Sequence, residues 1–157
     1  MRPNQQRHFN YPVMETHEIF TLLDKEIFIH TTDNPCVFMW TIDKYLIDAA
    51  REMLRRGYKL HCRFIWDKTN GTAPAFTVRF SHEYLLWFYK SPMMPISKTV
   101  RGKYTTIIRK PSRQHSRKPD AAYRMIQDFY PQQTICDVFS REKRDGISQW
   151  GNECGYF

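Results

Sequence analysis

The last third of the sequence carries residues whose types and spacing could bind a nucleotide-like ligand. A basic loop, residues 115–120 (His-Ser-Arg-Lys-Pro-Asp), precedes an amphipathic segment of helical period. An apolar run with one acid, residues 135–141, follows it, and residues 150–153 (Trp-Gly-Asn-Glu) close the segment. A fixed cation suits an anionic ligand group, and an acid inside an apolar strand must find partners if it is buried. This order indicates the edge of a nucleotide-type pocket.

The elements that must position these residues alternate between helix and strand. Asp43 is expected to cap the start of the second helix and Gly57 its end, with Leu46, Ala49, Ala50, Met53 and Leu54 on one apolar face. The alternation predicts one α/β domain with a largely parallel sheet and helices on both faces. Apolar periodicity predicts helices over residues 15–25, 43–56 and 119–129, and strands over residues 36–40, 60–66, 83–89, 105–109, 134–139 and 147–150.

The bulk composition limits the class of protein. A length of 157 residues suits one domain, with residues 1–10 as a polar arm. The formal net charge is +8, and many cations fall in residues 98–118 and 141–144. Charge runs are usually solvated surface, but a one-sided basic bias in a small domain favours a polyanionic partner. The four cysteines form no Cys-x-x-Cys pair and are interpreted as free thiols, not as a disulfide frame or metal site.

The expected location follows from the same features. No apolar run approaches the length that spans a membrane, and no leader-like segment is visible. We therefore expect a protein of the cytoplasm, or of the nucleus in a eukaryote, without a membrane partner.

Further segments extend the pattern towards the start of the chain. They are residues 11–14 (Tyr-Pro-Val-Met), 37–41 (Val-Phe-Met-Trp-Thr), 65–70 (Ile-Trp-Asp-Lys-Thr-Asn) and 82–86 (His-Glu-Tyr-Leu-Leu). Together with the C-terminal segments, this order resembles the adenine-N6 methyltransferases related to the seventy-kilodalton subunit of the messenger-RNA adenosine methyltransferase, a family with bacterial and phage DNA-modifying relatives. The resemblance covers roughly residues 8–153 and implies a Rossmann-like methyltransferase sheet that binds S-adenosylmethionine at the carboxyl ends of its strands.

The resemblance also implies roles for individual residues. Lys118 would contact the methionine carboxylate of the cofactor. Asp137 takes the place of the family's strand acid, and Arg141 takes the place of the arginine that follows that strand. Asn152 and Glu153 match the polar pair near the adenine and ribose.

The loop before the third helix would also meet the substrate. Arg113, His115 and Arg117 flank Lys118 and are our candidates for contacts near the target nucleotide. DNA is favoured over RNA as the nucleic acid, and no metal is expected, because methyl transfer from a sulfonium needs none.

One part of the family's pattern is missing from these residues. The chemistry of the family lies in an Asp-Pro-Pro-Trp turn upstream of the Tyr-Pro segment, and this sequence has nine prolines but no Pro-Pro pair. Residues 33–36 (Asp-Asn-Pro-Cys) resemble it superficially but follow the Tyr-Pro segment, so we interpret them as a turn. Without the strand that bears the catalytic turn, the sheet would keep an exposed edge, which a partner chain or a second copy could cover.

Three functions remain open at this point. The first is an adenine-N6 methyltransferase domain that lacks its catalytic turn and is inactive by itself. The second is a non-catalytic, nucleic-acid-binding subunit that forms a homo- or heterodimer in a methyltransferase complex. The third is a basic nucleic-acid-binding module without a cofactor. Cofactor binding separates the third from the first.

Overall fold

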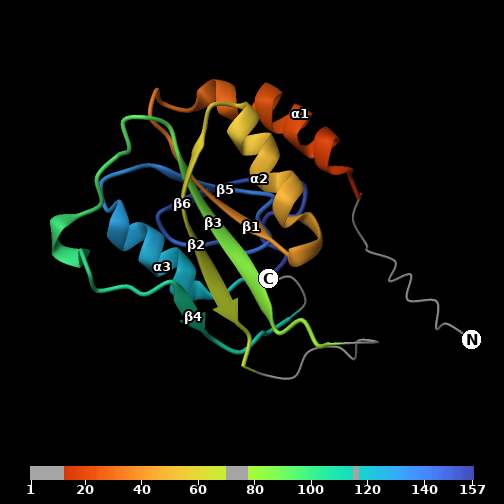
Figure 1. Ribbon diagram of the computed structural model, residues 1–157, viewed down its shortest axis with the longest axis vertical. Coiled ribbons are helices and arrows are strands. Elements are labelled where there is room, and N and C mark those ends of the chain that lie inside the picture. The colour runs from red at the N-terminus through yellow and green to blue at the C-terminus, as the bar shows by residue number, and fades with distance from the viewer. Residues whose placement is uncertain (1–12, 70–77, 115–116) are drawn as a thin grey trace, which may run out of the picture.

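The computed structural model describes residues 13–69, 78–114 and 117–157 (Figure 1). Its helices and 3-10 turns are α1 (Thr16–Glu26), η1 (Phe28–His30), η2 (Asp43–Tyr45), α2 (Leu46–Arg55), η3 (Lys98–Val100) and α3 (Asp120–Phe129). Its strands are β1 (Cys36–Thr41), β2 (Lys59–Asp67), β3 (His82–Tyr89), β4 (Ile107–Arg109), β5 (Ile135–Val138) and β6 (Ile147–Trp150). Each helix and strand expected from the sequence is present, with ends that differ by a few residues.

The main sheet is mixed, so the prediction of a largely parallel sheet was wrong. Its strand order is β1-β3-β2-β4, with β3 antiparallel to both neighbours and β4 parallel to β2. The reason is the connection from β2 to β3, which contains no helix in the described residues, so β3 returns along its neighbour. Strands β1 and β2 run the same way, joined by α2, and β3 lies between them.

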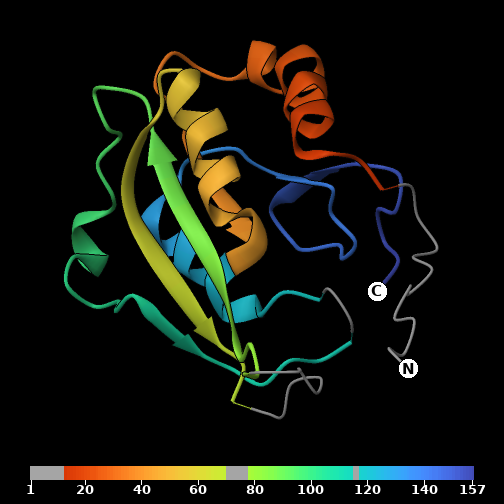
Figure 2. The same cartoon turned by 45° about the vertical axis from the view of Figure 1, so that its right-hand side comes forward.

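Helices cover both faces of this sheet, as predicted. Strand β3 is buried on both sides: Leu85 and Trp87 belong to a cluster with residues of α3, while Leu86 and Phe88 belong to a cluster with residues of α1 and α2. Successive side chains of a strand point to opposite faces, so the alternation places α3 on one face and α1 with α2 on the other. Figure 2 shows α1 beside α2 at one end of the molecule.

Two details of α2 differ from the sequence prediction. Asp43 lies in η2 and does not cap the helix, whose N-cap position is Tyr45. Met53 is fully buried, whereas Leu54 is 54% exposed, so Leu54 does not share the buried face of the helix. Gly57 does end the helix, with φ of +79°, a conformation that glycine adopts without steric cost.

The last two strands form a separate parallel sheet, β5-β6 (Figure 1). Val138 of β5 packs against the same core cluster as Val37 and Met39 of β1. Among the described residues, β1 pairs with β3 alone, so no strand is hydrogen-bonded to its other edge. None of the helices in the described part of the chain is long and apolar enough to cross a bilayer.

Candidate functional site

Lys118 lies at the end of the loop that enters α3. The helix begins at Asp120 with Pro119 as its N-cap, one residue later than predicted. The Lys118 Nζ lies 2.6 Å from Oε2 of Glu83 on β3. The same ammonium lies over the rings of Trp40 and Trp66, 5.4 Å and 6.0 Å from their centroids. Two indole faces and one carboxylate therefore hold this cation in place.

Glu83 is shared between two cations. Its Oε1 also pairs with Lys68 Nζ at 2.8 Å. Burial by itself would raise the pKa of Glu83, but the pairs with Lys118 and Lys68 hold that pKa below its usual value. Two ammonium groups and one carboxylate leave one positive charge, so the cluster has the charge to accept a carboxylate from a ligand.

Asp137 lies in β5, and its surroundings favour a less acidic carboxyl. Burial raises its pKa, against hydrogen bonds from Ser140 and Tyr123 and the charge of Arg144. Arg144 Nη1 lies 3.6 Å from Asp137 Oδ2, and the Arg144 guanidinium stacks on the Tyr123 ring at 3.6 Å. The acid predicted in this strand is thus held by three side chains from different segments.

Arg141 and Glu153 form a pair at the carboxyl ends of β5 and β6. Arg141 Nε lies 2.8 Å from Glu153 Oε2. The Arg141 guanidinium also lies over the rings of Tyr156 and Phe157, at 4.1 Å and 4.9 Å. Asn152 is exposed in the turn after β6. The structure therefore brings three of the five predicted cofactor residues, Arg141, Asn152 and Glu153, into one short region.

An ion pair connects the loop that bears Lys118 to this region. Arg117, beside Lys118 in the chain, donates from Nε to Glu142 Oε2 at 3.0 Å, and Glu142 is the neighbour of Arg141. The Arg117 guanidinium also lies 5.6 Å from the Phe157 ring that contacts Arg141. The loop before α3 and the segment after β5 are consequently held against each other.

The residues predicted to contact the target nucleotide have different environments. Arg113 pairs with Asp120, Nη1 to Oδ2 at 3.1 Å, and donates to the Lys118 carbonyl at 2.9 Å. Arg117 forms an ion pair with Glu142. The hydrogen bond from Arg117 and the charge of Arg144 hold the pKa of Glu142 below its usual value. His115 lies outside the described residues. Arg113 and Arg117 thus shape the loop, and their contact with a nucleotide stays a prediction.

The backbone is tight where β5 and β6 end. Phe139 has φ of +56°, and its N–H donates to the Trp150 carbonyl at 2.7 Å. A Cβ at Gly151, whose φ is +140°, would lie 3.0 Å from Phe139 Cα, so glycine is needed there. The Phe139 ring meets the Trp150 ring edge to face, with centroids 5.6 Å apart. A left-handed non-glycine residue beside polar side chains is typical of ligand sites.

The turn at residues 33–36 stands apart from this cluster. It leads into the amino end of β1, whereas Trp40, which contacts Lys118, lies near the carboxyl end. Its interpretation as a connecting segment is consistent with this position. Among the described residues, no three His, Cys, Asp or Glu side chains gather so that they could hold a metal ion.

Sequence analysis missed several residues that complete the site. Glu83 was recognised only as part of a matching segment, and its role as a counterion depends on a partner 35 positions away. Glu142 was counted within a basic stretch, although it is the acid that pairs with Arg117. Tyr156 and Phe157 carried no pattern of their own in the sequence.

Comparison with protein-family models gave one match across most of the chain. The model described as MT-A70 matches residues 2–153. A search of curated proteins returned no significant match.

Proposed function

The chain belongs to the MT-A70 family, and we propose that it is a domain of an adenine-N6 methyltransferase that acts on nucleic acid. Members of this family are S-adenosylmethionine-dependent methyltransferases, and the chain carries such a domain. DNA is the substrate that we favour, and the choice of adenine N6 rests on the family resemblance.

The observation that carries this proposal is the Arg117–Glu142 pair. It joins the loop that bears Lys118 to the segment after β5, where Arg141 pairs with Glu153, although these parts come from separate segments of the chain. In the proposed complex, Lys118 binds the methionine carboxylate, while Asn152 and Glu153 lie beside the adenine and ribose. Asp137 and Arg141 support this side of the pocket. When bound, the cofactor supplies an electrophilic methyl group on a sulfonium, for which no metal is required.

Activation of the adenine requires residues other than those that hold the cofactor. The N6 lone pair is delocalised into the ring, so an acid and a backbone carbonyl must accept its two hydrogens before it attacks. In the family, these acceptors belong to the Asp-Pro-Pro-Trp turn, which the 157 residues do not contain. We propose that transfer requires this turn on an additional strand, and that the edge of β1 beside Val138 is where the strand pairs.

Titration calorimetry with S-adenosylmethionine or its demethylated product tests the proposal. We expect weak but measurable binding, and Lys118→Ala should weaken it by about 1.5–3 kcal/mol, as for a lost charged hydrogen bond. Lys25→Ala is the matched control, since Lys25 is exposed on α1. Absence of heat at millimolar ligand, with circular dichroism showing a folded chain, would refute the proposal. The remaining interpretation would be a basic nucleic-acid-binding module that has no cofactor.

A non-catalytic subunit is the second candidate function. It is favoured by the missing Asp-Pro-Pro-Trp turn together with the unpaired edge of β1 in the described residues. Such a subunit would present its basic surface to nucleic acid and pair with an active relative. It predicts that the chain stimulates a catalytic partner in a mixed methyl-transfer assay, and that no added strand restores its own activity.

A further inference from the structure

Charge is distributed unevenly along this chain. No Asp or Glu occurs between Glu83 and Asp120, while nine Lys and Arg do. The residues that the structure does not describe, 1–12, 70–77 and 115–116, contain no acid either. Every carboxylate side chain of the sequence is therefore in the described part, and the ion pairs available to these nine cations can be compared directly.

Eight of these cations fall into two groups in the structure, and the ninth, Lys90, lies over the Tyr58 ring. Arg113, Arg117 and Lys118 pair with Asp120, Glu142 and Glu83 at the candidate cofactor site. A second group forms no ion pair with any described acid and is exposed to solvent; its members are Lys98, Arg101, Lys103 and Lys110. Arg109 lies among them, is 75% exposed and approaches Asp67 only at 3.6 Å. We name these five residues the η3–β4 ridge.

The backbone beneath the ridge is anchored at three points. The Ser97 N–H donates to the Phe129 carbonyl at the end of α3, at 2.8 Å. Tyr104 Oη donates to Asp128 of α3. Trp66 Nε1 donates to the Lys110 carbonyl at 2.7 Å. The main chain is thus fixed while the cationic side chains extend outwards, which lowers the conformational cost of binding an anionic partner.

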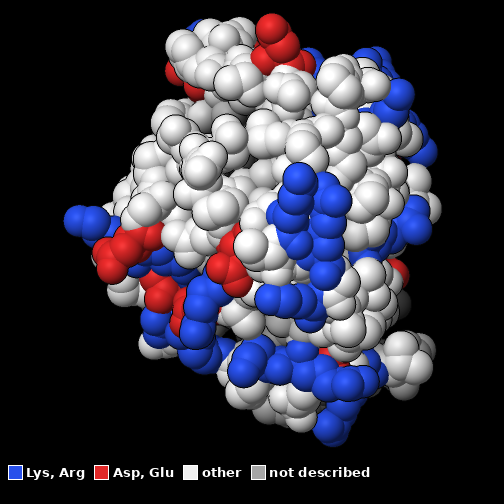
Figure 3. All heavy atoms as spheres, turned by 90° about the vertical axis from the view of Figure 1, so that its left-hand side faces the viewer, with Lys and Arg blue, Asp and Glu red and all other residues white. Residues whose placement is uncertain are grey.

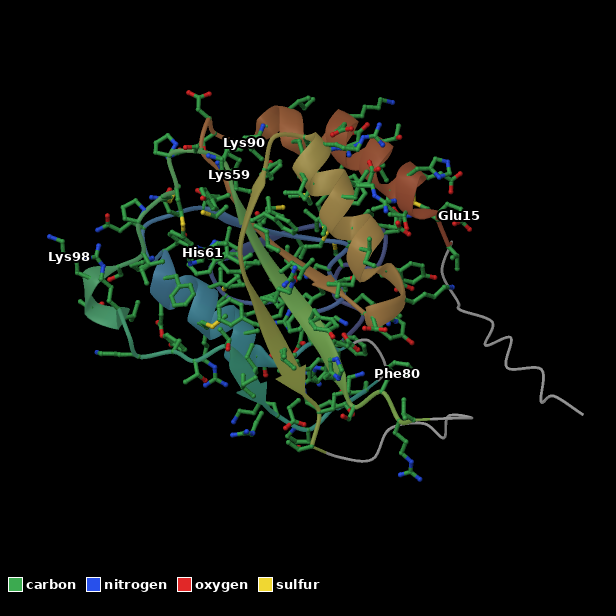
Figure 4. All side chains as sticks on the ribbon, in the orientation of Figure 1. Glu15, Lys59, His61, Phe80, Lys90 and Lys98 are labelled. Carbon is green, nitrogen blue, oxygen red and sulfur yellow. The ribbon has the colours of Figure 1, made fainter. Side chains whose placement is uncertain are left out.

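The figures show the same arrangement. In Figure 4, Lys98 extends from η3 into solvent at the margin of the molecule, and Lys59, His61 and Lys90 lie on the same side. Figure 3 shows Lys and Arg side chains gathered over the middle and lower part of the face that η3 lies on. Lys59 pairs in register with Tyr89, next to Lys90, so these two cations lie close to each other.

The ridge leads directly to the candidate site. Trp66 bonds the Lys110 carbonyl through its ring nitrogen, and the ring of the same residue faces the Lys118 ammonium at 6.0 Å. One tryptophan therefore separates the end of the ridge from the cluster proposed to hold the cofactor. A polymer bound along the ridge would pass within reach of that pocket.

We propose that the η3–β4 ridge binds the phosphate backbone of the nucleic-acid substrate, an inference that rests on the proposed function. Unpaired cations that displace counterions supply most of the affinity for a polyphosphate chain. Tyr104, 39% exposed between Lys103 and β4, offers an aromatic edge beside them. A membrane surface fits less well, since insertion requires a broad apolar face, and Ile107 and Tyr104 are the large apolar side chains exposed between residues 98 and 110.

Two triple variants with equal charge loss test the ridge. The first is Lys98→Gln with Arg101→Gln and Lys103→Gln. The matched control is Lys44→Gln with Arg51→Gln and Arg55→Gln, at exposed positions on η2 and α2. Fluorescence anisotropy with a labelled 20-nucleotide single strand, as DNA and as RNA, gives the dissociation constant between about 50 and 200 mM salt, the range over which phosphate contacts are most visible.

The ridge variant should bind at least about tenfold more weakly at low salt, and the slope of log affinity against log salt should fall by about 2, near 0.7 per lost contact. The control variant should keep the slope of the wild type. Equal slopes for ridge variant and wild type, or an equal loss in the control, would overturn the proposal, as would wild-type protein that binds neither strand. So would binding to phosphatidylserine vesicles that the oligonucleotide does not compete away.

Cofactor calorimetry on the same proteins separates this inference from the proposed function. Normal cofactor binding together with an unchanged salt slope in the ridge variant would refute only the proposal that the ridge binds nucleic acid. No cofactor binding in the wild type, with a clear ridge effect, would remove the methyltransferase proposal and leave a nucleic-acid-binding protein.

Discussion

At the scale of single residues, Glu83 controls the charge that Lys118 offers to a ligand. Since Glu83 also pairs with Lys68, it keeps a partner when a ligand carboxylate draws Lys118 away. Removing the Glu83 charge by Glu83→Gln should therefore strengthen cofactor binding by about three- to tenfold, on the order of 1 kcal/mol, opposite in sign to Lys118→Ala. Calorimetry on both variants measures this. If Glu83→Gln instead weakens binding as much as Lys118→Ala does, Glu83 itself contacts the ligand.

The same carboxylate makes stability depend on pH. Its folded pKa is below the ordinary value of 4.5, because Lys118 and Lys68 outweigh the effect of burial. A group with a lowered folded pKa contributes stability above its unfolded pKa, and that stability is lost as pH falls through the folded pKa. The wild type should thus exceed Glu83→Gln in stability at pH 7, and the difference should shrink below about pH 4.5.

Urea unfolding followed by tryptophan fluorescence measures both curves. Glu26→Gln is the control, because this carboxylate lies at the exposed end of α1. A difference between wild type and Glu83→Gln that stays constant down to pH 3 would show that the ion pairs do not stabilise the fold. Glu142 and Asp120, whose pKa values are also lowered by arginine partners against burial, add to the same acid sensitivity in all variants.

At the scale of elements, neighbouring residues of α2 should respond very differently to truncation. Met53→Ala removes a fully buried side chain and should cost about 2–5 kcal/mol of unfolding free energy. Leu54→Ala should stay within about 0.5 kcal/mol, because Leu54 is largely exposed. Chemical denaturation of the two variants decides this. Equal losses would mean that another chain or segment covers Leu54.

The edge of β1 gives a second prediction for an element. All five residues from Cys36 to Trp40 are apolar, yet each is only partly buried, as expected for a strand with one free edge. Alternate amides of β1 should exchange with solvent quickly, while those of β3, which has a partner on each side, should stay protected. Hydrogen exchange of the β1 and β3 amides, measured by NMR, tests this prediction. Uniform protection along β1 would show that its edge is covered in solution.

These elements also show what the sequence could predict. Apolar period and turn residues located every α-helix and strand of the described residues, because those signals are local. The direction of β3 and the exposure of Leu54 depend on which segments pack against each other. Those contacts join distant parts of the chain, so local sequence patterns do not predict them. A run such as Leu85 to Phe88, buried on both faces, has the same apolar pattern in a parallel and an antiparallel sheet.

At the scale of the whole molecule, the pairing of charged side chains was the property least predictable from the sequence. The sequence presents residues 98–118 as one basic stretch, but the fold supplies acids to its second half only, from residues as distant as Glu83, 35 positions from Lys118. The cofactor residues could be predicted in advance only because the family resemblance supplied their roles. The counterion of Lys118 could not, since Glu83 lies 35 positions away in the chain.

Methyl transfer depends on the 157-residue chain as a whole. The 157-residue chain should transfer no methyl group to adenine in DNA or RNA, although it binds cofactor and nucleic acid. Positioning and preorganised acceptors supply several kcal/mol or more of barrier reduction, and the acceptors for the N6 hydrogens belong to a turn that these residues lack. A bound cofactor beside Lys118 does not replace them, because its role ends at presenting the methyl group.

A radiolabelled-methyl assay tests this on two chains. One is the chain as it stands, and the other carries an added upstream strand that ends in Asp-Pro-Pro-Trp, taken from the source gene where it encodes one. Transfer should appear only with the added strand, since that strand can pair with the open edge of β1 and bring its acid towards Trp40 and Lys118. Robust turnover by the shorter chain would mean that the acceptors lie elsewhere, and Asp33 would be the first residue to replace.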